Sequence, residues 1–224
     1  MKTNRIQFLF TFLFMVIVSV GLQAQSDYKV SYKFDIQSED AMAAAMMGDA
    51  SMILMFKGDK ARVVMDMGVM STTVITHDKS QKGVMLMDMS MMGAKMGVEI
   101  APENYSELQA QTDIKPEIRE TGKTKKILEY NCKQAFVKTQ GVEIEIWYTP
   151  EIVPTNTATQ YTYEGIKGLP LEIHSNEQGV QMVITAEEVL TDPIAIAEFE
   201  LKIPEGYEKM SWAQMQQMGG LGGN

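Results

Sequence analysis

A period of two in hydrophobicity recurs along the chain and constrains its fold more than any other feature. Val30, Tyr32 and Phe34 alternate with polar residues, which is typical of a strand with one buried face. Similar runs follow, separated by short turn-forming segments such as Gly58-Asp59. Strands joined by short turns pair antiparallel, because parallel pairing needs a long crossover connection. We therefore expect a mainly β protein built on an antiparallel sheet rather than a βαβ fold.

The same pattern predicts about ten strands and two or three short helices. Ser38 can cap a helix over residues 39–47, and Pro102 can begin a helix over residues 102–111. A third short helix is expected over residues 212–218. The strand-like runs are residues 29–36, 51–56, 61–67, 72–76, 83–91, 96–100, 125–129, 133–138, 142–149, 169–174, 180–188 and 194–203.

Residues 1–24 have the three-part pattern of a secretory signal peptide. Lys2 and Arg5 give a positive start, residues 8–22 are an apolar run, and Ala24 precedes the expected cleavage site. The apolar run is shorter than the roughly 20 residues that span a bilayer. We therefore expect an exported protein that has no transmembrane segment once the signal is removed.

Residues 25–218 are expected to form one β-rich domain, because no Pro/Ser-rich linker or long charged block divides them. Residues 219–224 are rich in glycine and are expected to be a disordered tail. The chain has 29 acidic and 20 basic residues, which gives a formal net charge of −9. This balance argues against a nucleic-acid partner, since phosphate binding requires a basic face.

Residue constellations that carry catalysis are few in this sequence. It has no Gly-x-Ser-x-Gly, no His-Glu-x-x-His and no glycine-rich phosphate loop. His174 shares a strand face with Glu172 and is expected to face solvent, as are Glu143 and Glu145. The single cysteine, Cys132, is expected to be buried and inert in an oxidising compartment. We expect no enzyme activity, no catalytic residue, no metal site built from these residues and no cofactor.

Methionine is the unusual component of the sequence. The chain has 20 Met, and 14 of them lie between residues 42 and 96. On a strand, residues two apart share one face. The methionines that this rule places together, and which we expect to line a ligand site, are Met65, Met67, Met85, Met87, Met89 and Met91.

Three interpretations of these methionines remain open. Met fills irregular gaps, so the side chains can simply be core. Unbranched thioethers also repack around varied apolar ligands, which would make the face a deformable cavity for an acyl chain. Thioethers are in addition soft ligands that select Cu(I), and Met65-Asp66-Met67 has Met-x-Met spacing.

Three segments of the second half carry a resemblance to known proteins. Residues 126–135 read KILEYNCKQA, residues 147–152 read WYTPEI, and Gly168-Leu169-Pro170 follows. Together they resemble domain-of-unknown-function family 4412 of secreted Gram-negative proteins. A related pattern belongs to a family named for its Gly-Leu-Pro-Gly-Leu-Ile motif, from which this chain departs at residues 171–173.

The resemblance implies a fold but no activity. Proteins of this family are similar in architecture to periplasmic lipoprotein carriers, which implies a curved sheet or incomplete barrel around an apolar cavity. In such an arrangement residues 39–47 or the last helix would act as a lid. The implied location is the periplasm or the outer membrane, and no catalytic or ligand-contacting residue is carried over.

The sequence therefore favours a binding protein for an apolar small molecule or lipid. The first alternative is a copper-handling protein that binds Cu(I) through its Met-x-Met strands. The second is a structural or stress-associated envelope protein without a small ligand. Ligand identity, oligomeric state and any protein partner are not determined by the sequence.

Overall fold

A computed structural model describes the greater part of the chain. The described residues are 27–38, 50–89, 92–105, 116–139, 142–154, 165–177 and 180–219. The expected signal peptide at residues 1–24, the expected helix at 39–47, Met91 and the tail beyond residue 219 lie outside them.

The described strands form one twelve-stranded sheet with the order β12-β6-β5-β4-β3-β2-β1-β11-β10-β9-β8-β7. All neighbours pair antiparallel except β12, which runs parallel to β6. The strands are β1 (Tyr28–Ser38), β2 (Ser51–Lys57), β3 (Lys60–Asp66), β4 (Ser71–His77), β5 (Lys82–Met89), β6 (Ala94–Ile100), β7 (Glu117–Ile127), β8 (Tyr130–Thr139), β9 (Val142–Thr149), β10 (Leu169–Glu177), β11 (Val180–Leu190) and β12 (Glu208–Met210).

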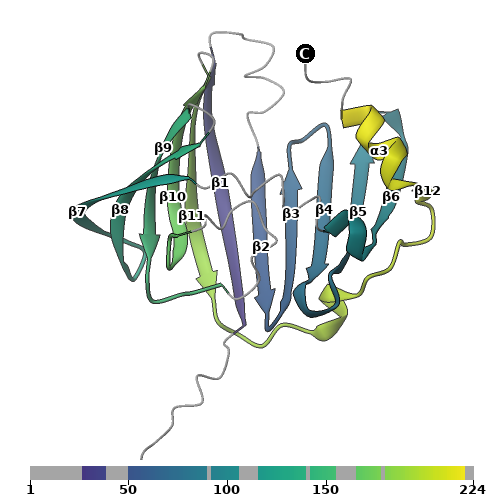
Figure 1. The fold of residues 1–224 in the computed structure, drawn as a ribbon, viewed down its shortest axis with the longest axis horizontal. Coiled ribbons are helices and arrows are strands. Elements are labelled where there is room, and N and C mark those ends of the chain that lie inside the picture. Colours follow the sequence, from purple (N-terminus) through teal and green to yellow (C-terminus); the bar gives the residue numbers. More distant parts are fainter. Residues whose placement is uncertain are drawn as a thin grey trace, which may run out of the picture.

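The sheet curves but does not close, because its edge strands β12 and β7 lie at opposite ends (Figure 1). This confirms the predicted mainly β fold with a curved, incomplete barrel. Helical elements are short: η1 (Asp78–Ser80), η3 (Ile196–Phe199) and α3 (Trp212–Gly219). Residues 102–105 are also helical, in agreement with a helix starting at Pro102. The rest of that expected helix, residues 106–111, is not described.

One large hydrophobic core runs across the middle of the sheet. It joins side chains of β1 and β2 with those of β8 to β11, including Tyr32, Leu54, Ile146 and Leu171. The hydroxyl of Tyr32 donates a hydrogen bond of 2.8 Å to the carbonyl oxygen of Pro170, two strands away. Burial raises the pKa of the Tyr32 hydroxyl, so this group stays protonated as a donor. The bond therefore ties the two halves of the sheet together.

The two faces of the sheet between β2 and β6 differ, and we call them the core face and the strap face. The core face carries Met52, Met65 and Met87, which are joined to Tyr32 of the core by direct cross-strand pairing. The opposite face is crossed by residues 194–205, which we call the strap; that face is the strap face. In Figure 1 the strap runs from β11 along one end of the sheet to β12.

The expected strand over residues 194–203 is wrong. These residues instead contain η3 and lie over the strap face, where Phe199 packs against Ile75 and Val84. The apolar residues of this segment also fit a strand pattern, because a strand within a sheet and a segment lying across one both bury alternate side chains against a flat surface. The short parallel strand β12 that follows was not predicted, and three residues leave too little periodicity to detect.

Candidate functional site

Cross-strand pairing gathers methionines on the core face. Met52 of β2 lies opposite Met65 of β3, and Met87 of β5 lies opposite Met96 of β6. Only Thr72 of β4 separates the two pairs. Because directly opposite residues share a face, these five side chains form one row across five strands.

The predicted site residues occupy this face in part. Met65, Met85, Met87 and Met89 lie on it, as their two-residue spacing requires. Met67 follows the end of β3 in the turn to β4, where its N–H donates to the carbonyl of Met70. Met91 lies outside the described residues. The structure adds Met52 and Met96, which single-strand spacing could not connect to the others because their strands were not known to be neighbours.

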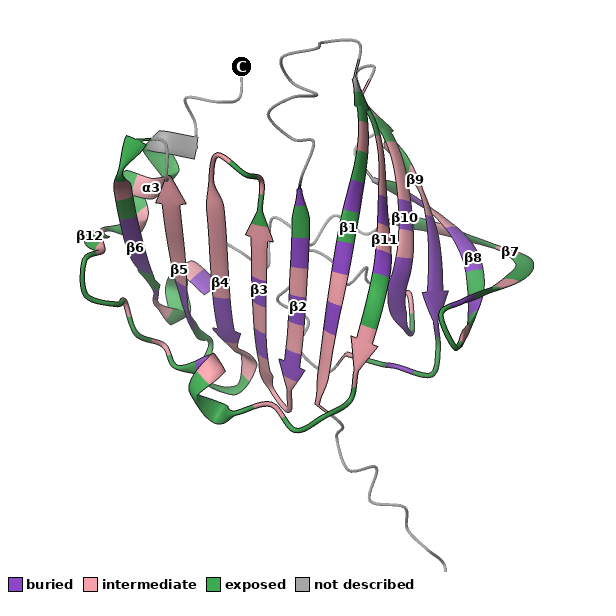
Figure 2. Cartoon of the chain, turned by 180° about the vertical axis from the view of Figure 1, so that it is seen from behind, coloured by how far each residue is buried: buried purple, intermediate pink, exposed green. Residues whose placement is uncertain are grey.

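The core face over β2 to β6 carries no ionisable side chain in its three central rows. The row beside the methionine row contains Leu54, Val63, Val74, Met85 and Val98, and the next contains Phe56, Ala61, Thr76, Gly83 and Ile100. Met65, Met85 and Met87 are half-buried, whereas Met52 and Met96 are buried. Figure 2 shows this difference in burial: β4 and β5 are largely pink, whereas buried purple residues alternate with less buried ones along β2. This is an uncharged apolar surface that is not fully covered.

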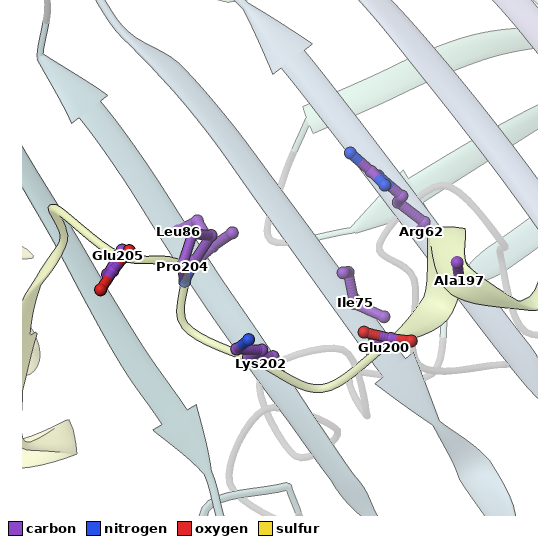
Figure 3. A pocket seen from close by; sticks show the side chains of 8 residues that line it. All are labelled: Arg62, Ile75, Leu86, Ala197, Glu200, Lys202, Pro204 and Glu205. Carbon is purple, nitrogen blue, oxygen red and sulfur yellow. The ribbon is translucent and has the colours of Figure 1, made fainter.

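A groove of about 310 Å³ lies on the strap face. Its floor is Ile75 and Leu86 from β4 and β5, and Arg62 of β3 lies at one end (Figure 3). The other walls come from the strap and its adjoining turn: Ala197, Glu200, Lys202, Pro204 and Glu205. Two cations and two carboxylates line it, so the groove has no net preference for one charge.

Arg62 fixes the strap over this groove. Its Nη1 donates to the Glu198 carboxylate at 2.5 Å and to the Glu198 carbonyl at 3.1 Å. The carbonyl of Phe199 is in turn 2.7 Å from Nε2 of His77. Asp27 accepts the N–H of Ile194 at 2.8 Å, close to the start of the strap. The groove therefore depends on these contacts, because they hold the strap in place beside β3 to β5.

The carboxylates that could have formed a catalytic pair are engaged separately. Glu143 forms an exposed ion pair with Arg119 at 3.6 Å. Glu145 instead accepts hydrogen bonds from Trp147 Nε1 at 2.8 Å and from Gln134 Nε2 at 2.5 Å. The two carboxylates thus have different partners, and nothing in their contacts resembles an acid–base pair.

Glu172, Lys125 and His174 form a charged cluster on β7 and β10. Glu172 accepts from Lys125 Nζ at 2.6 Å and is hydrogen-bonded to His174. Partial burial would raise the pKa of Glu172, but the hydrogen bonds from His174 and Lys125 outweigh burial and lower it. Lys125 also lies 4.3 Å from the ring centre of Trp147. His174 shares a face with Glu172, as predicted, but is only half-exposed.

Cys132 is buried with a free thiol, as predicted. Desolvation by burial raises its pKa to about 11, so very little thiolate forms at neutral pH. Within the described ranges, no three His, Cys, Asp or Glu side chains are grouped so as to hold a metal ion. Nor does the described part of the chain contain a helix long and apolar enough to cross a membrane.

The family model for a domain of unknown function, DUF4412, matches residues 40–207. The chain belongs to the DUF4412 family. This confirms the resemblance drawn from residues 126–170, and the match extends over the Met-rich strands as well as the segments that suggested it. No curated protein matches the chain.

Two of the similar solved structures illustrate the shared fold. One is PNGF-II, with a TM-score of 0.51 and 18% identity over 86% of this chain. The chain spans only about a third of the length of that protein, covering 33% of it. The other is an uncharacterised conserved protein from Thermus thermophilus, with a TM-score of 0.52, 9% identity, and coverage of 84% of this chain and 91% of the other. At these identities the likeness extends to the fold alone.

Carrier-like proteins are also found among the structural neighbours. A LolA superfamily protein from Nitrosomonas europaea aligns at 9% identity over 79% of this chain and 91% of its own length, with a TM-score of 0.34. A TM-score this low supports no inference about the function of this chain. The open curved sheet and its apolar face are therefore the features on which a function must rest.

Proposed function

We propose that this DUF4412 protein is a non-catalytic binding protein for an apolar ligand, a lipid or a lipidated protein, in the periplasm or at the outer membrane. The observation that supports the proposal is the uncharged core face over β2 to β6, at whose centre Met65, Met85 and Met87 are only half-buried. A surface of this kind on a curved sheet is a candidate interaction site, because soluble proteins rarely leave large apolar patches uncovered.

The mechanism is removal of acyl surface from water. Burying apolar area stabilises a complex by roughly 25 cal/mol per Å². Met side chains have three rotatable bonds and a polarizable sulfur, so they adjust to chains of different length. The proposed lining is Met65, Met67, Met85, Met87, Met89 and Met91, with residues 39–47 or α3 as a lid.

Uptake of N-phenyl-1-naphthylamine tests the proposal, because this dye fluoresces when it enters an apolar site. The protein is purified after export and without detergent, and native mass spectrometry is used in parallel to detect a bound mass that extracts into organic solvent. The perturbing variant is M65S/M85S/M87S. The matched control is M65L/M85L/M87L, which keeps the apolar volume and removes only the sulfurs.

We expect the Ser variant to weaken dye binding at least tenfold, because each serine replaces a side chain whose full burial is worth roughly 1.5–3 kcal/mol. The Leu variant should bind as the parent does. Far-UV circular dichroism checks that both variants keep the sheet. Equal dye binding by the folded Ser variant and the parent would contradict the proposal, and would favour methionines that only fill the core.

A further inference from the structure

Met96 lies at the centre of a group of thioethers on the core face. Met87 is directly opposite it on β5, and Met85 and Met89 are two residues either side of Met87. Directly opposite side chains have Cβ atoms about 4.5–5.5 Å apart, and diagonal ones are within reach when the side chains are long. Three sulfurs can therefore approach one point without moving the backbone.

The chemistry of this group is specific. Thioether sulfur is soft and uncharged, and among the first-row metals it selects Cu(I). Met96 is only 8% exposed, while Met85, Met87 and Met89 are half-buried. A metal bound here would have one ligand fixed by packing and two or more that can adjust. This combination suits an ion that tolerates low coordination and an apolar surrounding.

We propose that Met87 and Met96, joined by Met85 or Met89, bind one Cu(I) ion. The proposal goes beyond the uptake of an apolar ligand, and the two can fail separately. Apolar uptake needs the volume of these side chains, which leucine retains, whereas the metal needs their sulfur.

The cysteine and the two histidines of the described chain are placed elsewhere. Cys132 is buried on β8, far along the sheet from β5 and β6. His77 contacts the Phe199 carbonyl beneath the strap, and His174 is bonded to Glu172 on β10. None of them lies on the rows that hold the four methionines, so none is needed for the site and none is expected to compete within it.

The second methionine pair supplies an internal control. Met52 and Met65 are also directly opposite on the same face. The strand neighbours two residues away are Leu54 for Met52 and Val63 for Met65, and Met67 has left the strand. This pair therefore has two sulfurs on its strands, where the Met96 group has four. The register predicts tighter binding at the Met96 group.

Anaerobic titration with Cu(I), in competition with the chromophoric chelator bicinchoninate, measures the affinity of the exported protein. We expect one ion per chain. M87L/M96L should weaken binding at least tenfold, while M52L/M65L and C132A should leave the affinity within twofold of the parent.

Three results would overturn the proposal. The first is a parent protein that takes no Cu(I) from the chelator, and the second is a folded M87L/M96L variant with the affinity of the parent. The third is a loss of affinity in M52L/M65L as large as that in M87L/M96L, which would show that the Met96 group is not the specific site.

Discussion

Phe199 is the buried side chain of the strap, and its replacement by alanine tests how much it contributes to holding the strap on the sheet. The side chain is 1% exposed and packs against Ile75 and Val84, with Met55 and Leu86 at the margin. Hydrogen bonds also hold the strap: Arg62 binds the carbonyl of Glu198, His77 lies against the carbonyl of Phe199, and Asp27 accepts the N–H of Ile194. Phe199 is the only buried residue of the strap, because Ile194, Leu201 and Ile203 pack on the sheet only partly buried, so we expect its ring to make the largest single apolar contribution.

The magnitude follows from the area that the ring buries. A phenylalanine buries about 150–250 Å², which at roughly 25 cal/mol per Å² corresponds to about 4–6 kcal/mol. Alanine keeps part of this area, and a compact unfolded chain has already buried some of it. We expect Phe199→Ala to lower the free energy of unfolding by about 3–4 kcal/mol, within the range found for Phe→Ala in cores.

Urea unfolding followed by tryptophan fluorescence measures this value in a W212F background. The remaining tryptophan, Trp147, is 9% exposed on β9, so its signal reports the half of the sheet that the strap does not touch. The control is Ile196→Ala on the same strap, because Ile196 is 60% exposed and its loss should cost less than about 0.5 kcal/mol.

Two outcomes distinguish the possible roles of the strap. A shift of the Trp147 transition in F199A means that the strap and the sheet unfold together. If F199A and I196A unfold at the same urea concentration, the strap is not part of the cooperative unit and the reasoning from buried area is refuted.

Two further predictions concern single positions. A Cβ on Gly97 would lie 2.6 Å from Cγ2 of Ile203, so Gly97→Ala should destabilise the protein by about 1–3 kcal/mol in thermal unfolding. Adding Ile203→Ala in the double variant should remove most of that cost. If the two losses of stability simply add, the contact is not the cause. Cys132, with its pKa raised to about 11 by burial, should not react with Ellman's reagent at pH 8 until the protein is unfolded in urea, and rapid reaction of the native thiol would mean that it is accessible.

The sequence was sufficient to predict where the strands lie, because each strand carries its own period of two in hydrophobicity. Eleven of the twelve strand-like runs coincide with strands or with the end of one, as residues 125–127 do at the end of β7. The exception, residues 194–203, shows the limit of the method. A hydrophobic period says that alternate side chains are buried, and it does not distinguish pairing within a sheet from lying across one.

The candidate site was predictable only within single strands. The spacing of Met85, Met87 and Met89 requires that they share a face, and the structure agrees. The neighbours of that face depend on strand order and register, which are set by turns and by long-range packing. Met96 and Met52 were therefore missed, although both belong to the same row. Met67 was included wrongly among the strand residues, because β3 ends at Asp66.

The two faces of β2 to β6 differ in how they are covered. The strap face is closed by Phe199 and held by Arg62. On the core face of the same strands, Met65, Met85 and Met87 are only half-buried. The central rows of the core face carry no charge, whereas the strap face includes Arg62 and Glu99. Leucine or valine would give such a face more rigid packing than methionine does. In the proposed function these flexible, half-buried thioethers accommodate a ligand rather than only fill the core, and the Ser and Leu variants measure that difference.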